Sequence, residues 1–367
     1  MNWRIPVAEP LLGEEEQKAV SDVVASGRIS QGERVTEFEG KIAAYLGRKY
    51  AVACHSGTCA NEAMLMSLFE PKDFLKSFNG VWVAVPACTS VAVSNPILTV
   101  HGQPDFIDLD RKLCMNIEKV KDFDKAILAT YEYGSSPERF DLLLESSIPV
   151  LEDACVALGS ECNGRKLGTF GLAASLSFYV NKLITCGEGG MVVTNDERIA
   201  TYCREYVNHG RKQSQYHEEW YYYHYGRNAK MTDLQAAIGL VQLGKIQRFI
   251  DARKKIARAI HASIKGDVRY DSLKPSDDEV PWYYWIVNWD GSVNMKEKSA
   301  QLQKDYGVET RPTMPVLPRI PFYNMQRNYP VAEASQNGFL VGCQPAILEH
   351  GDLGYLCESV STVLGIK

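Results

Sequence analysis

A lysine stands between a strand-like segment and a glycine cluster in the sequence SFYVNKLITCGEGG, at position 182. A lysine at a strand end is most often a surface residue whose aliphatic stem lies along apolar neighbours. If the amine is buried instead, the loss of hydration lowers its pKa and makes it a nucleophile for carbonyl carbon. Lys182 is therefore either a surface residue or an amine that bonds to an aldehyde or ketone.

An aspartate directly follows another strand-like run, in PVLEDACVALGS. Asp153 is suited to three roles, namely a helix cap, a metal ligand and the partner of a cationic heterocycle. Taken alone, the pattern favours the helix cap, because a carboxylate after a strand commonly accepts hydrogen bonds from the next backbone N–H groups.

A third segment, VACHSGTCANEAML, combines a strand ending at Cys54, a turn of small residues at 56–58 and a helix beginning near Ala60. Backbone N–H groups in such a turn bind phosphate, helped by the helix dipole. A serine or threonine before a helix is also an ordinary cap, and by itself this segment favours the cap.

The three segments predict one site, because polar residues after parallel strands gather at the carboxyl edge of a sheet. An amine for an aldehyde, an acid for a pyridine nitrogen and backbone donors for a phosphate are what pyridoxal 5′-phosphate requires. A nicotinamide site would require GxGxxG after the first strand, and the sequence lacks it. We therefore expect pyridoxal phosphate as the cofactor.

Strands and helices alternate along the part of the chain that carries these segments. Amphipathic helices are expected over 14–26 and 35–46, ended by Gly27 and Gly47. The alternation that follows predicts an α/β fold with a mostly parallel seven-stranded sheet covered on both faces. The expected strands are 50–54, 81–85, 105–108, 126–130, 150–152, 174–179 and 191–194.

A long helical pattern over 231–264 leads out of this domain, and the character of the sequence then changes. We expect a large cofactor-binding domain over 1–245 and a smaller α+β domain over 246–367. The elements expected in the smaller domain are a strand over 283–289 and helices over 295–306 and 350–364.

Composition excludes several classes of partner. The formal net charge of −5 and pI of 5.9 offer no field for nucleic acid. The ten cysteines show neither CxxC pairs nor metal-ligand spacing, which indicates reduced thiols and no metal. No apolar run approaches the roughly 20 residues of a membrane span, and the N-terminus lacks a signal-peptide pattern. These features predict a cytoplasmic protein without nucleic-acid or membrane partners.

Almost the whole chain resembles the DegT/DnrJ/EryC1/StrS sugar aminotransferases, which have the type I fold of pyridoxal-phosphate-dependent transferases. The lysine segment SFYVNKLITCGEGGMVVTND is the most specific match. Further segments that match are SGRISQGERVTEFEGKIAAYLG, CHSGTCANEAML, LEDACVALGSECNGRKLGTFG, NHGRKQSQYHEE, GRNAKMTDLQAAIGLVQL, ETRPTMPVLPRIPFY and YPVAEASQNG.

The resemblance assigns roles to individual residues. Lys182 would hold the cofactor covalently and move the proton between cofactor and substrate, and Asp153 would pair with the pyridine nitrogen. Asn228 would reach the phosphate of the neighbouring subunit's cofactor, which implies a homodimer with shared active sites. The residues implied for phosphate binding within the chain are Gly57, Thr58, Cys59 and Ser177.

The resemblance also implies the reaction. Dehydratases of the family have histidine in place of the lysine, so Lys182 favours transamination. L-glutamate would donate the amino group, and a nucleotide-linked keto-sugar would accept it. The segments GRISQG, ETRP and YPVAE are more similar to the C4-aminating branch, the perosamine synthase type. This implies a 4-keto-6-deoxy sugar and a role in polysaccharide or O-antigen synthesis.

Four positions depart from the family pattern. Ser90 replaces an aromatic residue that stacks on the cofactor, and Val156 replaces a glutamine or glutamate near it. The segment TYEYG replaces VHLYG and puts Tyr131 at a histidine position, and Leu317 takes the place of another histidine. An unusual acceptor or reduced activity is the implied consequence.

Substrate contacts are assigned to Tyr131, His209 and Arg311, with alternatives left open. His209 also fits a residue that ends the helix over 196–207, and Arg311 fits a structural ion pair equally well. Two other functions stay open for the chain. One is amination of a cyclitol or another keto-sugar without a nucleotide, and the other is a ligand-binding or regulatory role without turnover.

Overall fold

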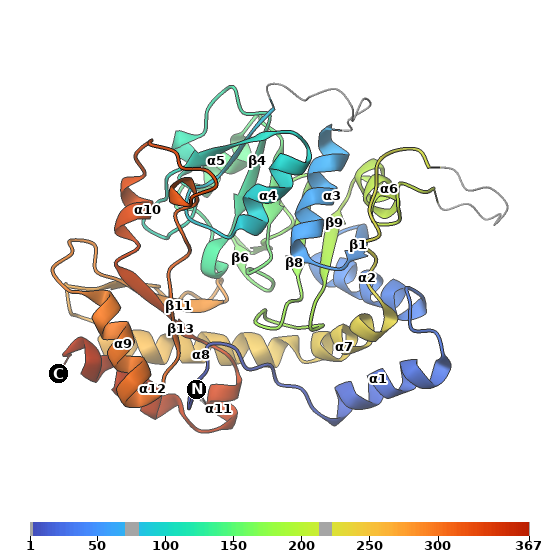
Figure 1. The fold of residues 1–367 in the computed structure, drawn as a ribbon. Helices are drawn as coiled ribbons and strands as arrows, with labels where there is room; N and C mark the ends of the chain where they lie inside the picture. The colour runs from blue at the N-terminus through green and yellow to red at the C-terminus, as the bar shows by residue number, and fades with distance from the viewer. Residues whose placement is uncertain (1–2, 70–80, 213–221, 367) are drawn as a thin grey trace.

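A computed structural model describes residues 3–69, 81–212 and 222–366. Its main sheet has seven strands in the order β1-β9-β8-β5-β4-β2-β3 (Figure 1). β9 is antiparallel to both neighbours, and the other pairs are parallel. The strands are β1 (Tyr50–Cys54), β2 (Trp82–Pro86), β3 (Gln103–Ile107), β4 (Ala126–Thr130), β5 (Val150–Asp153), β8 (Ala173–Ser177) and β9 (Gly190–Thr194).

Helices cover both faces of this sheet, as alternate side chains of β1 show. Val52 and Cys54 pack in one apolar cluster with α3 (Gly57–Phe69), α4 (Val91–Thr99) and α6 (Glu197–Tyr206). Ala51 and Ala53 belong to a second cluster with α2 (Glu33–Leu46) on the opposite face. Because both faces are covered, the strands are apolar throughout, and all five residues of β4 and of β9 are buried.

The first two helices end where the glycines predict. α1 (Glu14–Ser26) has the expected bounds, and α2 begins two residues earlier than expected. Gly27 and Gly47 adopt left-handed φ values of 70° and 69°, which glycine reaches without a Cβ clash.

The long helical pattern over 231–264 forms two consecutive helices. α7 (Asp233–Gly244) ends at Lys245, where ψ is 1°, and α8 (Ile246–Ile264) follows directly. The ammonium of Lys245 lies 2.7 Å from carboxylates of both Glu15 and Glu16 in α1. Periodicity alone does not register a one-residue break, because the apolar spacing continues through it.

A smaller antiparallel sheet lies beside α8 in the order β10-β11-β13-β12. Ile5 forms a parallel bridge with Val308, so the first described residues pair with this part of the chain. The boundary at 245 stays a prediction. The elements here are β10 (Asp271–Ser272), β11 (Tyr283–Val287), α9 (Met295–Tyr306), β12 (Thr310–Pro312), α10 (Pro330–Ala334), β13 (Gly338–Gly342), α11 (Ala346–Glu349) and α12 (Leu353–Leu364).

Several short elements lie between strands of the main sheet, and η3 lies between β12 and α10. They are the 3-10 helices η1 (Ile117–Lys119), η2 (Glu132–Gly134) and η3 (Leu317–Arg319), helix α5 (Phe140–Glu145), and the hairpin β6 (Glu161–Cys162) and β7 (Arg165–Lys166).

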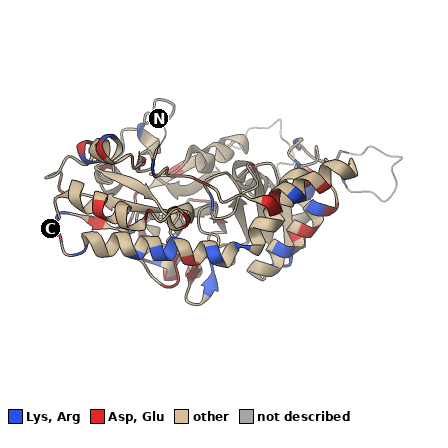
Figure 2. Ribbon diagram, turned by 90° about the horizontal axis from the view of Figure 1, so that it is seen from below, with Lys and Arg blue, Asp and Glu red and all other residues tan. Residues whose placement is uncertain are grey.

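Charges of both signs are mixed over the outer helices in the view of Figure 2. All ten cysteines are free in this structure. Within 3–69, 81–212 and 222–366, no helix has the length and apolar character needed to cross a membrane.

Candidate active site

A cavity of about 340 Å³ opens at the carboxyl ends of β4, β5 and β8. Five predicted site residues line it: Gly57, Thr58, Asp153, Ser177 and Lys182. The structure thus brings the three sequence segments together at one edge of the sheet, as the strand-end argument predicts.

Lys182 lies five residues after the end of β8, and its side chain faces the cavity. Its Nζ lies 4.2 Å from the ring centroid of Trp282, which approaches from the segment leading into β11. Dense surrounding protein disfavours the charged form, so burial lowers the pKa of the Lys182 amine. Of the two sequence interpretations, the structure therefore supports an amine enclosed in a site.

Asp153 ends β5 with only 3% of its surface exposed. Its Oδ2 accepts a hydrogen bond of 2.7 Å from Asn61 Nδ2, and its Oδ1 accepts one of 3.0 Å from the Cys155 backbone N–H. No helix begins after Asp153, and the described residues contain no group of side chains suited to a metal. Two donors thus hold a carboxylate that faces the cavity.

The phosphate segment is the first turn of α3. This helix begins at Gly57, three residues before the expected start at Ala60. Its first N–H groups lack intrahelical acceptors and lie at the cavity. A Cβ on Gly57 would lie 2.8 Å from Cys155 Sγ and 2.9 Å from Ser177 Cβ, so only glycine fits against this wall.

Cys59 does not line the cavity. Its side chain is 3% exposed, and its backbone N–H donates to Ser56 Oγ at 3.2 Å. Among the residues assigned to phosphate, Gly57, Thr58 and Ser177 therefore reach the cavity, whereas the Cys59 N–H is already engaged.

Sequence reasoning missed Glu132, a second carboxyl in the cavity wall. It begins η2 two residues after the end of β4, is 2% exposed and accepts a hydrogen bond from Thr89 Oγ1. Burial raises the pKa of Glu132 to about 7, and the charge of Asp153 contributes to the rise. The strand-end argument applied to TYEYG contains the signal, since Glu132 lies two residues after the end of β4 and Asp153 is the last residue of β5.

Tyr131 points away from the cavity, so its assignment as a substrate contact is not supported within one chain. Its ring is fully buried, and its hydroxyl donates to Glu152 Oε2 at 2.6 Å. The neighbouring Thr130 and Glu132 do line the cavity. Successive side chains of an extended segment alternate between the two faces, which is why Tyr131 faces the core.

The departures from the family pattern separate into two groups. Ser90 and Val156 line the cavity, and Ser90 also caps α4 by accepting a hydrogen bond from the Ala92 N–H at 3.2 Å. Leu317 is fully buried in the core that the small sheet shares. Only the first group changes the surface that a ligand meets.

Three other predicted residues lie outside the cavity of their own chain. Asn228 is exposed, and its Oδ1 accepts a hydrogen bond from Lys230 at 2.8 Å. His209 has a left-handed φ of 64° just after α6, as expected of a residue that ends a helix. Arg311 pairs with Glu309 at 2.7 Å, which is the structural alternative left open for it.

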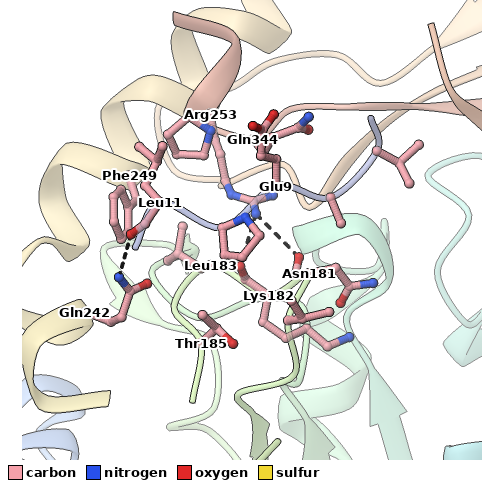
Figure 3. A pocket seen from close by; sticks show the side chains of 15 residues that line it. Glu9, Leu11, Asn181, Lys182, Leu183, Thr185, Gln242, Phe249, Arg253 and Gln344 are labelled. Atoms are coloured by element: carbon pink, nitrogen blue, oxygen red, sulfur yellow. Dashed lines mark hydrogen bonds between the residues drawn. The ribbon is translucent and has the colours of Figure 1, made fainter. Parts of the chain in front are cut away.

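A second, smaller cavity lies beside the backbone of Lys182 and is lined in part by Arg253 of α8 (Figure 3). Arg253 is 4% exposed, and its guanidinium donates to the carbonyl oxygens of Lys182 and Trp282. Nothing in the sequence near Arg253 indicates these contacts, because they join residues 71 and 29 positions apart.

Comparison with known proteins gives the family. The model of the DegT/DnrJ/EryC1/StrS aminotransferase family matches residues 10–358. The chain belongs to this family. The family predicted from the lysine segment is therefore confirmed.

Relatives of this DegT/DnrJ/EryC1/StrS chain include proteins named for amino-sugar synthesis. GDP-perosamine synthase of Escherichia coli O157:H7 is 30% identical, over 97% of this chain and 98% of its own length. The dTDP-4-dehydro-2,3,6-trideoxy-D-glucose 4-aminotransferase of Saccharopolyspora spinosa is 29% identical, over 94% of this chain and 92% of its own.

A solved structure confirms the predicted type I fold of this DegT/DnrJ/EryC1/StrS chain. The GDP-4-keto-6-deoxy-D-mannose 3-dehydratase of E. coli has a TM-score of 0.88 and 28% identity, covering 98% of this chain and all of that one. That structure contains hydrated pyridoxal phosphate, the cofactor predicted from the sequence.

Proposed function

We propose that the protein is a pyridoxal-phosphate-dependent aminotransferase that transfers the amino group of L-glutamate to a nucleotide-linked 4-keto-6-deoxy sugar. One observation carries the proposal. The amine of Lys182, the carboxylate of Asp153 and the first turn of α3 at Gly57 line one cavity.

The cavity fits the cofactor group by group. The free N–H groups at the start of α3, together with Ser177, are suited to its phosphate. Asp153 is suited to a pyridinium nitrogen, because Asn61 and the Cys155 N–H hold the carboxylate in place. Bound pyridoxal phosphate supplies an aldehyde for amines and an electron sink for the carbon that loses a proton.

Lys182 has two tasks in this proposal. Its amine attaches the cofactor, and after release it accepts and returns a proton as a general base and acid. Attachment of the cofactor and acceptance of the proton both start from the uncharged amine, which the lowered pKa of Lys182 favours. A lysine at position 182 also favours transamination over dehydration, since the resemblance implies histidine at this position in the dehydratases of the family.

Asn228 supports a homodimer with shared sites. Its side chain is exposed and does not line the cavity of its own chain, as expected of a residue that contacts a partner's cofactor. We place this reaction in the cytoplasm, as the sequence predicts.

The experiment follows the two half-reactions separately. The protein is loaded with pyridoxal phosphate, and the visible absorbance of the bound cofactor is recorded during titration with L-glutamate. After desalting, GDP-4-keto-6-deoxymannose or the corresponding dTDP-linked 4-keto sugar is added, and the amino sugar is measured by mass spectrometry. We expect loss of the visible band with glutamate and its return with one of the sugars.

Lys182→Ala is the control, and it should bind cofactor without covalent attachment and show neither spectral change. Glutamate-driven product formation by Lys182→Ala would contradict the proposal. So would a parent protein whose band resists every amino donor, which would favour a regulatory or ligand-binding role.

A second acceptor class is favoured by Ser90 and Val156, because both change the cavity wall relative to the family pattern. That class is a cyclitol or another keto-sugar without a nucleotide. Thermal unfolding with GDP or dTDP alone separates the two, since a nucleotide that binds the folded state raises the midpoint. A midpoint unmoved by either nucleotide would favour the second class.

A further inference from the structure

Arg253 is a buried cation without an anionic partner. It lies on α8 with 4% of its surface exposed, and among the residues that the structure describes no carboxylate forms an ion pair with it. Its Nε is buried without a hydrogen-bond acceptor. Burying a guanidinium in this way destabilises the folded state. If this position required only packing, a neutral side chain would give a more stable fold.

The donors of Arg253 go to the main chain of two separate segments. Nη1 donates to the carbonyl oxygens of Trp282 at 2.6 Å and Pro281 at 3.2 Å. Nη2 donates to the carbonyl oxygen of Lys182 at 3.2 Å, with a longer contact of 3.5 Å to that of Asn181. Figure 3 shows the guanidinium reaching from α8 toward Asn181 and Lys182.

The two segments that Arg253 joins also meet through their side chains. Trp282 Nε1 donates to the Asn181 carbonyl oxygen at 3.0 Å. Lys182 Nζ lies over the face of the Trp282 ring, 4.2 Å from the ring centroid. The planar fork of arginine donates to both segments at once, whereas a lysine ammonium is a single point of contact. The backbone of Lys182 and the ring beneath its amine are thereby fixed relative to each other.

The charge of Arg253 acts on the same amine. The groups that face Lys182 are Asp153 from β5, Glu132 after β4, Cys155, and Arg253 from α8. Burial is the largest cause of the lowered pKa of Lys182; the first three groups oppose it, and the positive charge of Arg253 adds to it.

We propose that Arg253 is a positioning residue of the reaction, which fixes the Lys182 main chain against the Trp282 ring and, through its charge, favours the uncharged and nucleophilic form of the Lys182 amine. The inference rests on the catalytic role proposed for Lys182. It assigns to α8 a contribution to the chemistry in addition to its place in the core.

The first measurement uses the protein without cofactor. Lys182 is acetylated with acetic anhydride between pH 6 and 10, and the labelled peptide is quantified by mass spectrometry to give the titration midpoint of the amine. We expect the parent midpoint to lie below the ordinary lysine value of about 10.4. Arg253→Gln, which removes the charge, should raise the midpoint above that of the parent.

The second measurement uses the cofactor-loaded protein and Arg253→Lys, which retains the charge and loses the fork. Its labelling midpoint should stay close to that of the parent. Its kcat should fall about 10-fold to 100-fold with little change in KM for glutamate, because a small misplacement of the amine is costly. Arg248→Gln is the matched control, since Arg248 is an exposed residue of α8 that pairs with Glu349, and it should change neither quantity.

The outcomes distinguish the inference from the function on which it rests. A parent midpoint at the ordinary lysine value would overturn the charge effect, whereas the role of Lys182 itself is decided by the glutamate titration with Lys182→Ala as control. A low parent midpoint that is the same in Arg253→Gln would overturn the charge effect, and an unchanged kcat in Arg253→Lys would overturn the positioning. If Arg253→Gln does not fold, kcat of Arg253→Lys decides, because a purely structural link would change stability and leave kcat per folded molecule unchanged.

Discussion

Replacing Gly57 by alanine tests the phosphate cradle directly. The added Cβ would lie 2.8 Å from Cys155 Sγ and 2.9 Å from Ser177 Cβ, with Ser177 Oγ at 3.3 Å. Real Cβ contacts are longer than the first two distances, so the cavity wall must shift. Overpacking of this kind costs about 1–3 kcal/mol. If that strain is relieved when the phosphate cradle opens, the Kd for pyridoxal phosphate should rise about 5-fold to 150-fold.

The assay compares two ligands that differ only in the phosphate. The Kd for pyridoxal phosphate and for pyridoxal is measured by titration of the visible absorbance in the parent and in Gly57→Ala. Because Gly57 belongs to the helix turn assigned to the phosphate, the variant should lose affinity for pyridoxal phosphate and keep most of its affinity for pyridoxal.

Gly40→Ala is the matched control for Gly57→Ala. Gly40 lies in α2, and a Cβ there meets nothing within 4 Å. This substitution should stabilise the fold by up to about 1 kcal/mol through helix propensity and leave both dissociation constants unchanged. An equal loss of affinity for both ligands in Gly57→Ala, or no loss for either, would refute the assignment of the cradle.

Three further predictions concern buried carboxylates and are measured by urea unfolding of the protein without cofactor. The pKa of Glu132 is raised from 4.5 to about 7, so the contribution of Glu132 to the free energy of unfolding falls as pH rises between these values. Relative to the parent, Glu132→Gln should therefore gain up to about 3 kcal/mol in free energy of unfolding at pH 8 and little at pH 4. An equal difference at both pH values would contradict this. Glu152→Ala should lower the free energy of unfolding by about 3–5 kcal/mol, since it leaves the buried Arg48 without its carboxylate. The double variant with Arg48→Met should lose less stability than the sum of the two single variants. Asp233→Ala should cost about 1–2 kcal/mol, because Asp233 Oδ1 accepts from the Gly32 N–H at 2.8 Å at the start of α2, and a loss below about 0.3 kcal/mol would show that this cap is dispensable.

Local pattern predicted most of the elements well. α1, α9 and strands β1 and β4 have the expected bounds, because side-chain periodicity and the terminating glycines act within a few residues. The errors have local causes as well. The break at Lys245 leaves the apolar spacing unchanged, and α3 begins within the segment predicted as a turn, since the same small residues suit both.

The direction of a side chain at a strand end was harder to predict than its position. Tyr131 and Glu132 are adjacent, yet one faces the core and the other the cavity. The register of the strand end decides which face each side chain occupies, and a one-residue change would exchange them. The family resemblance favoured Tyr131, whereas the fold places Glu132 in the cavity wall and Tyr131 in the core.

The sequence by itself determined the chemistry of the site. Lys182, Asp153 and Gly57 each follow a predicted strand within a short segment, and parallel strands end at one edge of a sheet, so their meeting was predictable. Only the tertiary structure decided what surrounds them. Asn61 reaches Asp153 across 92 residues, and Trp282 and Arg253 approach Lys182 from the region of the smaller sheet. Such contacts depend on how whole elements pack, and no local pattern encodes that packing.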